Sequence, residues 1–112
     1  LRGYYIVNKD TAKCEAVSNK TLNGFGDGHP SCHGRIIYTD CYPGRDRQQH
    51  LIKHDLDSHI TTVIGSFFSP LKYFAEGRCD LHPRLSVDGR KLFFDSVHQG
   101  KRKLCYFDLC NH

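Results

Sequence analysis

The sequence has 112 residues, of which 38% are hydrophobic and 25% charged, and this composition excludes a disordered chain. The 16 Lys and Arg residues outnumber the 12 Asp and Glu residues, for a formal charge of +4. They are dispersed rather than gathered into the dense stripe typical of nucleic-acid modules. No run of about 18 apolar residues occurs, so we expect neither a nucleic-acid partner nor a membrane span.

Short β-branched and aromatic runs, bounded by Gly, Asp or Asn, follow one another along the chain. Such runs are typical of strands, and no segment keeps the apolar period of a helix over about three turns. We therefore predict almost no helix. In chain order the expected strands cover residues 3–8, 13–18, 28–32, 35–41, 50–55, 60–65, 79–86, 91–96 and 103–109.

A sequence repeat organises these strands. The segment 29–40 recurs at 82–95, where it begins 53 residues later, and the segment 50–56 recurs at 103–109 at the same distance. A fainter third copy covers residues 3–11. A period of about 50 residues that contains only short strands is typical of a propeller blade. We therefore predict an all-β fold, a partial β-propeller of about two and a quarter four-stranded antiparallel blades.

The repeat divides one continuous domain, residues 1–112, into three parts. Residues 1–26 supply the outer strands of one blade, residues 27–77 a full blade, and residues 78–112 most of the next. A closed propeller needs at least about four blades. We therefore expect the remaining blades to come from a longer protein or from further copies of the chain, because unpaired strand edges favour such pairing.

Two runs resemble the repeat of TolB-like propellers. They are residues 82–96, His-Pro-Arg-Leu-Ser-Val-Asp-Gly-Arg-Lys-Leu-Phe-Phe-Asp-Ser, and residues 104–109, Leu-Cys-Tyr-Phe-Asp-Leu. The run 78–84, Arg-Cys-Asp-Leu-His-Pro-Arg, is similar to the oligogalacturonate-lyase-like branch of these WD40-like proteins. The resemblance covers nearly the whole chain, although Leu85 replaces the usual Trp or Phe and Val87 the usual Pro. It implies a fold more strongly than an activity, because one fold hosts many functions.

An Asp-x-His-Pro motif occurs twice, with Asp27 and His29 in the first copy and Asp80 and His82 in the second. Strand periodicity places the Asp and the His of each copy on one face, and the first strand of each propeller blade lines the central channel. Imidazole and carboxylate groups together suit Mn²⁺ or Zn²⁺, so we predict that these four residues bind a divalent metal. The alternative is that each His-Pro begins a strand and hydrogen-bonds the neighbouring blade.

Arginines accompany both motifs. A guanidinium group matches the carboxylate of a uronate sugar bidentately, and on this ground we assign Arg78 and Arg35 to substrate binding. In a β-elimination a neutral His takes a proton from the sugar while a cation stabilises the developing charge. His82 and Arg84 are the candidate catalytic residues for this reaction. The alternative for the arginines is simple surface solvation.

The remaining side chains carry weaker signals. Most of the six cysteines are expected as buried free thiols. We expect a further group of histidines to lie on the surface, at turns or on outer strands, namely His33, His50, His54, His59 and His98.

The sequence thus favours a carbohydrate-associated propeller segment with an acidic oligosaccharide or polysaccharide as its partner. It would belong to a metal-assisted uronate-polysaccharide lyase or to an oligosaccharide-binding protein. The alternative is a non-catalytic TolB-like scaffold for protein–protein contacts. We expect the periplasm or the cell exterior, with the cytoplasm as the alternative.

Overall fold

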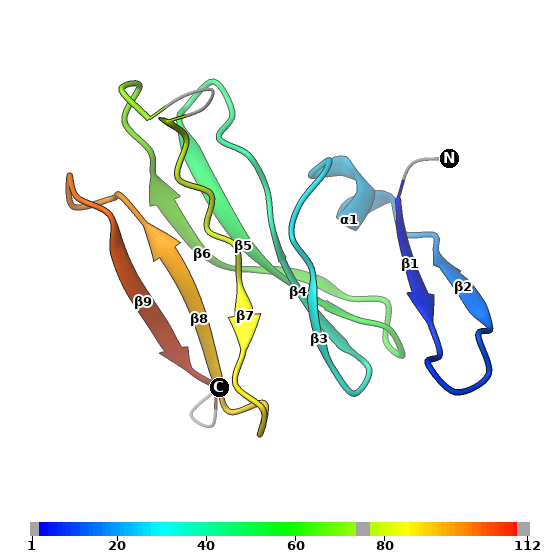
Figure 1. Cartoon of the computed structure of the whole chain (residues 1–112). Coiled ribbons are helices and arrows are strands. Elements are labelled where there is room, and N and C mark those ends of the chain that lie inside the picture. The colour runs from blue at the N-terminus through cyan, green and yellow to red at the C-terminus, as the bar shows by residue number, and fades with distance from the viewer. Residues whose placement is uncertain (1–2, 74–76, 110–112) are drawn as a thin grey trace.

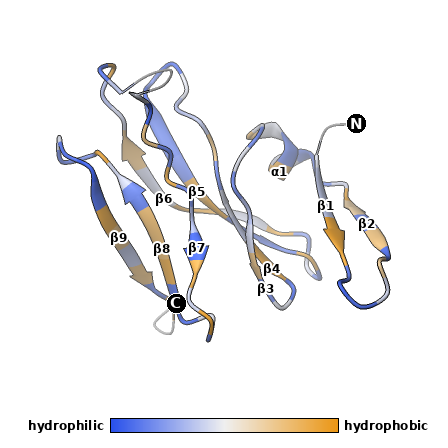
Figure 2. Cartoon of the chain, in the orientation of Figure 1, coloured by the Kyte–Doolittle hydropathy of each residue, from blue (hydrophilic) through white to orange (hydrophobic). Residues whose placement is uncertain are grey.

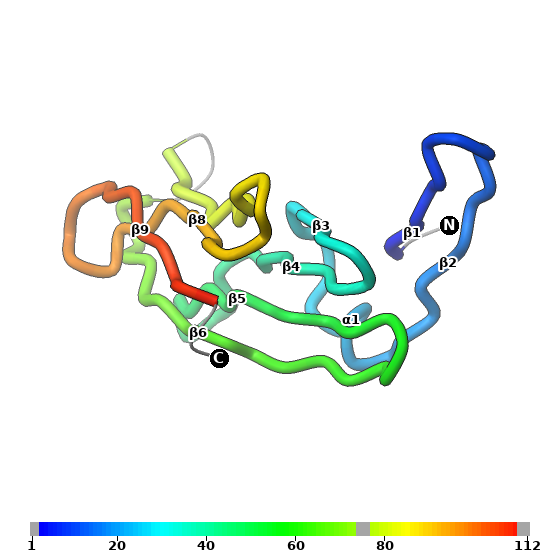
Figure 3. The backbone as a smooth tube through the Cα atoms, turned by 90° about the horizontal axis from the view of Figure 1, so that it is seen from below, coloured from blue at the N-terminus to red at the C-terminus, as the bar shows by residue number. Residues whose placement is uncertain are grey.

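Three antiparallel sheets follow one another along the chain in the computed structural model, which describes residues 3–73 and 77–109. Strands make up 44% and helices 7% of this part, so the prediction of an all-β fold is confirmed. Figure 1 shows the sheets side by side in chain order, and Figure 3 shows the same succession from below. No helix in these two ranges combines the length and the hydropathy needed to span a bilayer.

Within each sheet, consecutive strands are hydrogen-bonded neighbours. The first sheet contains β1 (Tyr4–Val7) and β2 (Cys14–Val17), and the short helix α1 (Lys20–Gly24) leads from it to the second sheet. The second sheet has the order β3 (Ser31–His33), β4 (Ile36–Asp40), β5 (Gln48–Asp55) and β6 (Thr61–Phe68). The third has the order β7 (Arg84–Leu85), β8 (Lys91–Ser96) and β9 (Lys103–Asp108).

The middle sheet is covered on both faces. Neighbouring β4 residues point to opposite sides, so that Ile37 packs in a core with the first sheet and Tyr38 in a core with the third. In β5 the neighbours Leu51 and Ile52 point to opposite faces, so both residues are fully buried, one in each core. The sequence of β5 is nevertheless mostly polar, with Leu51 and Ile52 as its apolar residues. Figure 2 shows hydrophobic stretches on β1 and on parts of β8 and β9, whereas β5 is hydrophilic over most of its length.

Two expected strands are much shorter than predicted. The strand expected over 28–32 is β3, and the strand expected over 79–86 is the two-residue β7. In both cases the missing part contains a His whose backbone N–H bonds the side chain of Asp40 instead of a neighbouring strand. The first strands of the two larger sheets nevertheless lie together, because the Leu85 N–H donates to Ser31 Oγ at 3.2 Å.

Helix α1 is not foreseen by the sequence pattern. Asn19 caps it, with its Oδ1 accepting the N–H of Leu22 at 2.9 Å, and the Leu22 side chain is fully buried. The side chain of an Asn is well suited to this capping position. A helix of five residues is too short to show apolar periodicity, which is why the sequence does not predict it.

The prediction of buried cysteine thiols holds for part of the set. Cys41 and Cys79 are buried free thiols, but Cys14 and Cys32 are exposed, so the prediction is wrong for these two. Both exposed residues lie on short strands with few buried residues. Cys110 lies outside the described residues.

Candidate ligand site around His29 and His82

The carboxylate of Asp40, at the end of β4, lies at the centre of the candidate site and is almost fully buried. Its Oδ1 accepts the backbone N–H of His29 at 2.7 Å, and its Oδ2 accepts the backbone N–H of His82 at 2.8 Å. These two N–H groups belong to the segments that enter the second and the third sheet. One carboxylate therefore joins two consecutive sheets through charge-assisted hydrogen bonds.

Asp40 also orients the His29 ring. The Nδ1 atom of His29 lies 3.1 Å from Oδ2 and 3.2 Å from Oδ1 of Asp40. Because an ionised carboxylate only accepts hydrogen bonds, His29 carries a proton on Nδ1 in this contact. Its Nε2 atom is then the ring nitrogen left to meet a ligand.

The two repeated histidines form a stacked pair. The ring centroids of His29 and His82 are 4.4 Å apart, and their planes differ by 22°. The structure therefore brings together His29 and His82, two of the four residues that the repeat was expected to gather. His82 has a left-handed backbone conformation, with φ of 45°, and is exposed to solvent.

An aromatic and a cation extend the site. The Tyr42 ring meets His29 edge to face, at 6.2 Å between centroids, and Cζ of Arg78 lies 4.0 Å from the Tyr42 centroid. Arg78 Nε donates to Asp80 Oδ1 at 2.6 Å. This hydrogen bond raises the pKa of Arg78 above its usual value, since it stabilises the charged guanidinium group.

The other predicted arginines are already paired with carboxylates. Arg84 donates to both carboxylate oxygens of Asp95, at 3.2 and 3.1 Å, and to the backbone oxygen of His82 at 2.9 Å. Arg35 precedes β4, at the end of the strand opposite to Asp40, and its Nε donates to Asp57 at 3.1 Å. The structure therefore brings Arg78 and Arg84 to the candidate site but does not bring Arg35 there.

The donor atoms do not fit the predicted Mn²⁺ or Zn²⁺. Within residues 3–73 and 77–109, no group of three or more His, Cys, Asp or Glu side chains is arranged to hold a metal ion. Of the four predicted ligands, Asp80 is paired with Arg78, and Asp27 lines a separate pocket on the side of β1. The metal site stays a prediction, and no chemistry below depends on it.

A pocket of about 420 Å³ opens beside His82. It is lined by Cys79, Asp80, His82, Asp95, Arg102, Lys103 and Leu104. Its two carboxylates are neutralised by ion pairs with Arg78 and Arg84. Its two cations instead donate to uncharged oxygen atoms, Arg102 to the Gly77 carbonyl at 2.7 Å and Lys103 to Gln99 Oε1 at 2.8 Å. The pocket thus has an excess of positive charge, which favours an anionic ligand.

Comparisons with protein-family models, with curated proteins and with solved structures found no match. The TolB-like and oligogalacturonate-lyase-like resemblance therefore rests on the sequence runs quoted above.

Sequence reasoning missed four residues of this site, namely Asp40, Tyr42, Arg102 and Lys103. Asp40 and Asp95 are equivalent in the repeat, and nothing in the sequence shows that the first is buried and the second partly exposed. Arg102 and Lys103 were visible as a short basic run. Their position next to His82 depends on how β8 and β9 pair.

The expectation of surface positions for the other histidines is wrong for His54. His33, His59 and His98 are exposed and His50 is partly buried, but His54 has no exposed surface. Its Nδ1 pairs with Thr61 Oγ1 at 2.8 Å, and its Nε2 is buried without a hydrogen-bond partner among the residues that the structure describes. Burial lowers the pKa of His54 from its usual value. Successive side chains of β5 alternate between its two faces, so His54 lies on the same face as Ile52, toward the core shared with the first sheet.

Proposed function

We propose that the chain is a β-propeller segment that binds an acidic oligosaccharide in the pocket beside His82. The propeller assignment is supported by the antiparallel sheets that follow one another in chain order, and by the sequence repeat that relates the second sheet to the third. In such a fold the first strands of successive blades lie together, as β3 and β7 do.

The observation that carries the binding proposal is the charge distribution in the pocket. Asp80 and Asp95 are held by arginines, while Arg102 and Lys103 hydrogen-bond only to neutral oxygens in the contacts described above. A guanidinium group and an ammonium group at one pocket match a sugar carboxylate. The exposed His82 ring, whose stacking partner His29 is held by Asp40, provides a further polar group at the rim.

A lyase reaction is the finer form of this proposal. In a β-elimination on a uronate residue, His82 would take the proton from the carbon next to the carboxylate. The electron pair left behind would form the ring double bond as the bond to the neighbouring glycosidic oxygen breaks, and that oxygen would take a proton from water and leave as a hydroxyl group. Arg102 would stabilise the charge that develops on the carboxylate. Arg84 is less well placed for this role, since its guanidinium group is paired with Asp95.

One observation favours a second candidate function, a non-catalytic scaffold for protein contacts. Asp40 accepts hydrogen bonds from backbone N–H groups of the two segments that enter the sheets. These contacts are typical of a structural residue, because they hold the backbone in place and do not position a reacting group. In this case the stacked histidines would serve only the junction between sheets. The scaffold proposal therefore predicts no saccharide binding.

The test is a titration of the ¹⁵N-labelled chain with trigalacturonate, comparing the native protein with His82→Asn. Asn tolerates the left-handed backbone of position 82, so the substitution removes the ring with little strain. His59→Asn is the matched control, because His59 is also exposed and also has a positive φ, of 62°.

We expect trigalacturonate to shift the amide signals of His82, Arg102 and Lys103, and His82→Asn to weaken binding by about tenfold or more, the effect of losing one hydrogen bond to a charged group. His59→Asn should bind as the native chain does. An absence of shifts at these residues would overturn the proposal in favour of the scaffold. Ultraviolet absorbance of an unsaturated product distinguishes a lyase from a binding protein.

A further inference from the structure

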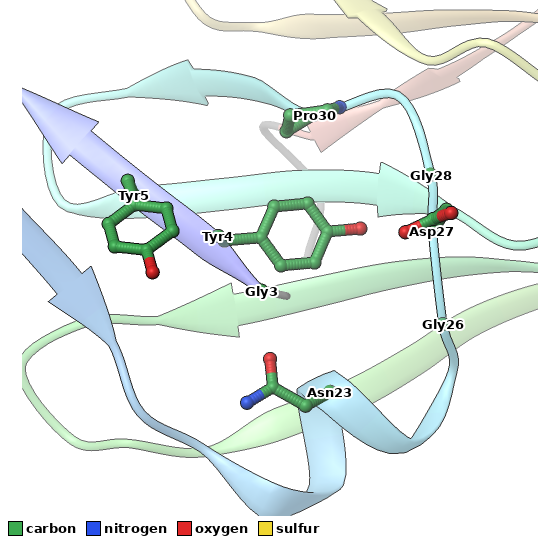
Figure 4. Close-up of a pocket in the computed structure, with 8 residues that line it drawn as sticks. All are labelled: Gly3, Tyr4, Tyr5, Asn23, Gly26, Asp27, Gly28 and Pro30. Atoms are coloured by element: carbon green, nitrogen blue, oxygen red, sulfur yellow. The ribbon is translucent and has the colours of Figure 1, made fainter. Parts of the chain in front are cut away.

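We propose that the chain has a second saccharide subsite, for an uncharged sugar ring, on the side of β1. It is a pocket of about 530 Å³ between β1 and the segment that leads into β3 (Figure 4). It is lined by Gly3, Tyr4, Tyr5, Asn23, Gly26, Asp27, Gly28 and Pro30. No residue of this pocket lines the one beside His82, so the two sites are independent.

The Tyr4 ring is held in a fixed position in this pocket. Its hydroxyl group hydrogen-bonds Thr39 Oγ1 on β4 at 2.9 Å. The segment beneath it has a glycine at position 28, where an added Cβ would lie 2.9 Å from the Tyr4 hydroxyl and would overlap the backbone oxygen of Asp40. A ring that is already immobilised loses little conformational entropy when a ligand packs on it.

Polar groups stand around the aromatic rings. Figure 4 shows Tyr4 in the middle of the pocket, with Tyr5 and Asp27 toward opposite ends and Asn23 and Pro30 on the two remaining sides. The Asp27 residue is exposed, and the Asn23 amide faces Gly3, since a Cβ on that glycine would lie 3.6 Å from Asn23 Oδ1.

This combination matches the chemistry of a pyranose ring. The C–H faces of a sugar pack on the apolar faces of aromatic rings. The carboxylate of Asp27 accepts hydrogen bonds from hydroxyl groups, and the amide of Asn23 both donates and accepts them. Ligand sites in proteins commonly pair apolar walls with a few such polar groups.

The charge of the pocket selects a neutral sugar over a uronate. Asp27 is the charged residue among the lining residues, and neither Lys nor Arg is among them. A uronate carboxylate would be repelled by Asp27. In the pocket beside His82, by contrast, Arg78 and Arg84 pair with the two lining carboxylates, which leaves Arg102 and Lys103 as an excess of positive charge. The two pockets therefore differ in the class of sugar that they accept.

The test is a titration of the ¹⁵N-labelled chain with galactotriose, a neutral probe, and separately with trigalacturonate. We expect galactotriose to shift the amide signals of Gly3, Asn23, Gly26 and Gly28, and trigalacturonate to leave these signals in place. Tyr5→Ala should weaken galactotriose binding by about 2- to 10-fold, the usual contribution of one aromatic contact. Tyr106→Ala is the matched control, since Tyr106 also lies on an edge strand and is 58% exposed against 45% for Tyr5.

Asp27→Asn is the second variant, because the side chain is exposed and Asn keeps nearly the same shape. It should reduce the preference for galactotriose over trigalacturonate at this pocket by removing the repulsion. The inference is overturned if galactotriose shifts none of the four signals, or if Tyr5→Ala binds as Tyr106→Ala does. The binding of trigalacturonate beside His82 is measured at the amide signals of other residues. If the neutral-sugar subsite fails its test, the proposal for the pocket beside His82 therefore still stands, and a failure of that proposal leaves the subsite standing.

Discussion

Replacing Asp40 by Asn tests whether one carboxylate holds two sheets together. The two side chains have nearly the same shape, so the substitution changes hydrogen bonding without opening a cavity. In the native chain each carboxylate oxygen accepts a different backbone N–H, that of His29 on Oδ1 and that of His82 on Oδ2. An amide has only one oxygen, and its NH₂ group would face the second N–H donor.

The expected loss follows from this geometry. One partly buried N–H group loses its acceptor, which costs about 1–3 kcal/mol, and the remaining bond is no longer charge-assisted. We therefore expect Asp40→Asn to lower the free energy of unfolding by about 2–4 kcal/mol. The Asp95→Asn variant is the matched control, since it makes the same change at the equivalent position of the repeat. The side chain of Asp95 is 42% exposed and pairs with Arg84, so its loss should cost less than about 1 kcal/mol.

Urea unfolding at neutral pH measures both values, and amide hydrogen exchange identifies the affected group. Protection should fall at His29 or His82 in the Asp40 variant and stay unchanged at both in the Asp95 variant. Equal losses of stability in the two variants would refute the argument, because they would show that burial between the sheets adds nothing to the Asp40 contacts.

Two further predictions concern His54 and Gly28. Burial lowers the pKa of His54 in the folded chain, so the unfolded chain binds a proton at this residue more readily. The free energy of unfolding should therefore decrease as the pH falls below about 6.5, by up to about 1.4 kcal/mol per pH unit. Urea unfolding at pH values on either side of this point should show a shallower acid loss for His54→Gln than for the native chain, and identical slopes would contradict the assignment. Gly28→Ala should destabilise the chain by about 1–3 kcal/mol, since its Cβ meets Asp40 and Tyr4. Gly24 lies in α1 with open space around it, so Gly24→Ala should instead stabilise the chain by up to about 1 kcal/mol. Thermal or urea unfolding measures both variants, and a loss of stability in both would contradict the packing argument.

The candidate site was only partly predictable from the sequence. The repeated Asp-x-His-Pro motif predicts the pairing of His29 with His82, because equivalent positions of neighbouring repeats lie side by side. The same reasoning places Asp27 and Asp80 with them, but Asp80 turns to Arg78 and Asp27 faces the pocket beside β1. The carboxylate that meets both histidines comes from Asp40, which lies 11 residues after His29 and 42 before His82.

Local patterns in the sequence determined which segments are strands and how they are ordered. Alternating apolar residues, turn residues such as Asp88-Gly89, and the repeat act through neighbouring residues, so a single chain shows them without its fold. The tertiary structure alone decided which side of each strand is covered. Leu51 and Ile52 are both fully buried because the first and third sheets cover opposite faces of β5, and His54, two residues after Ile52, lies on the face toward the first sheet. The same holds for Asp40 and Asp95, which are equivalent in sequence but differ in burial, because the contacts that desolvate a side chain come from segments distant in the chain.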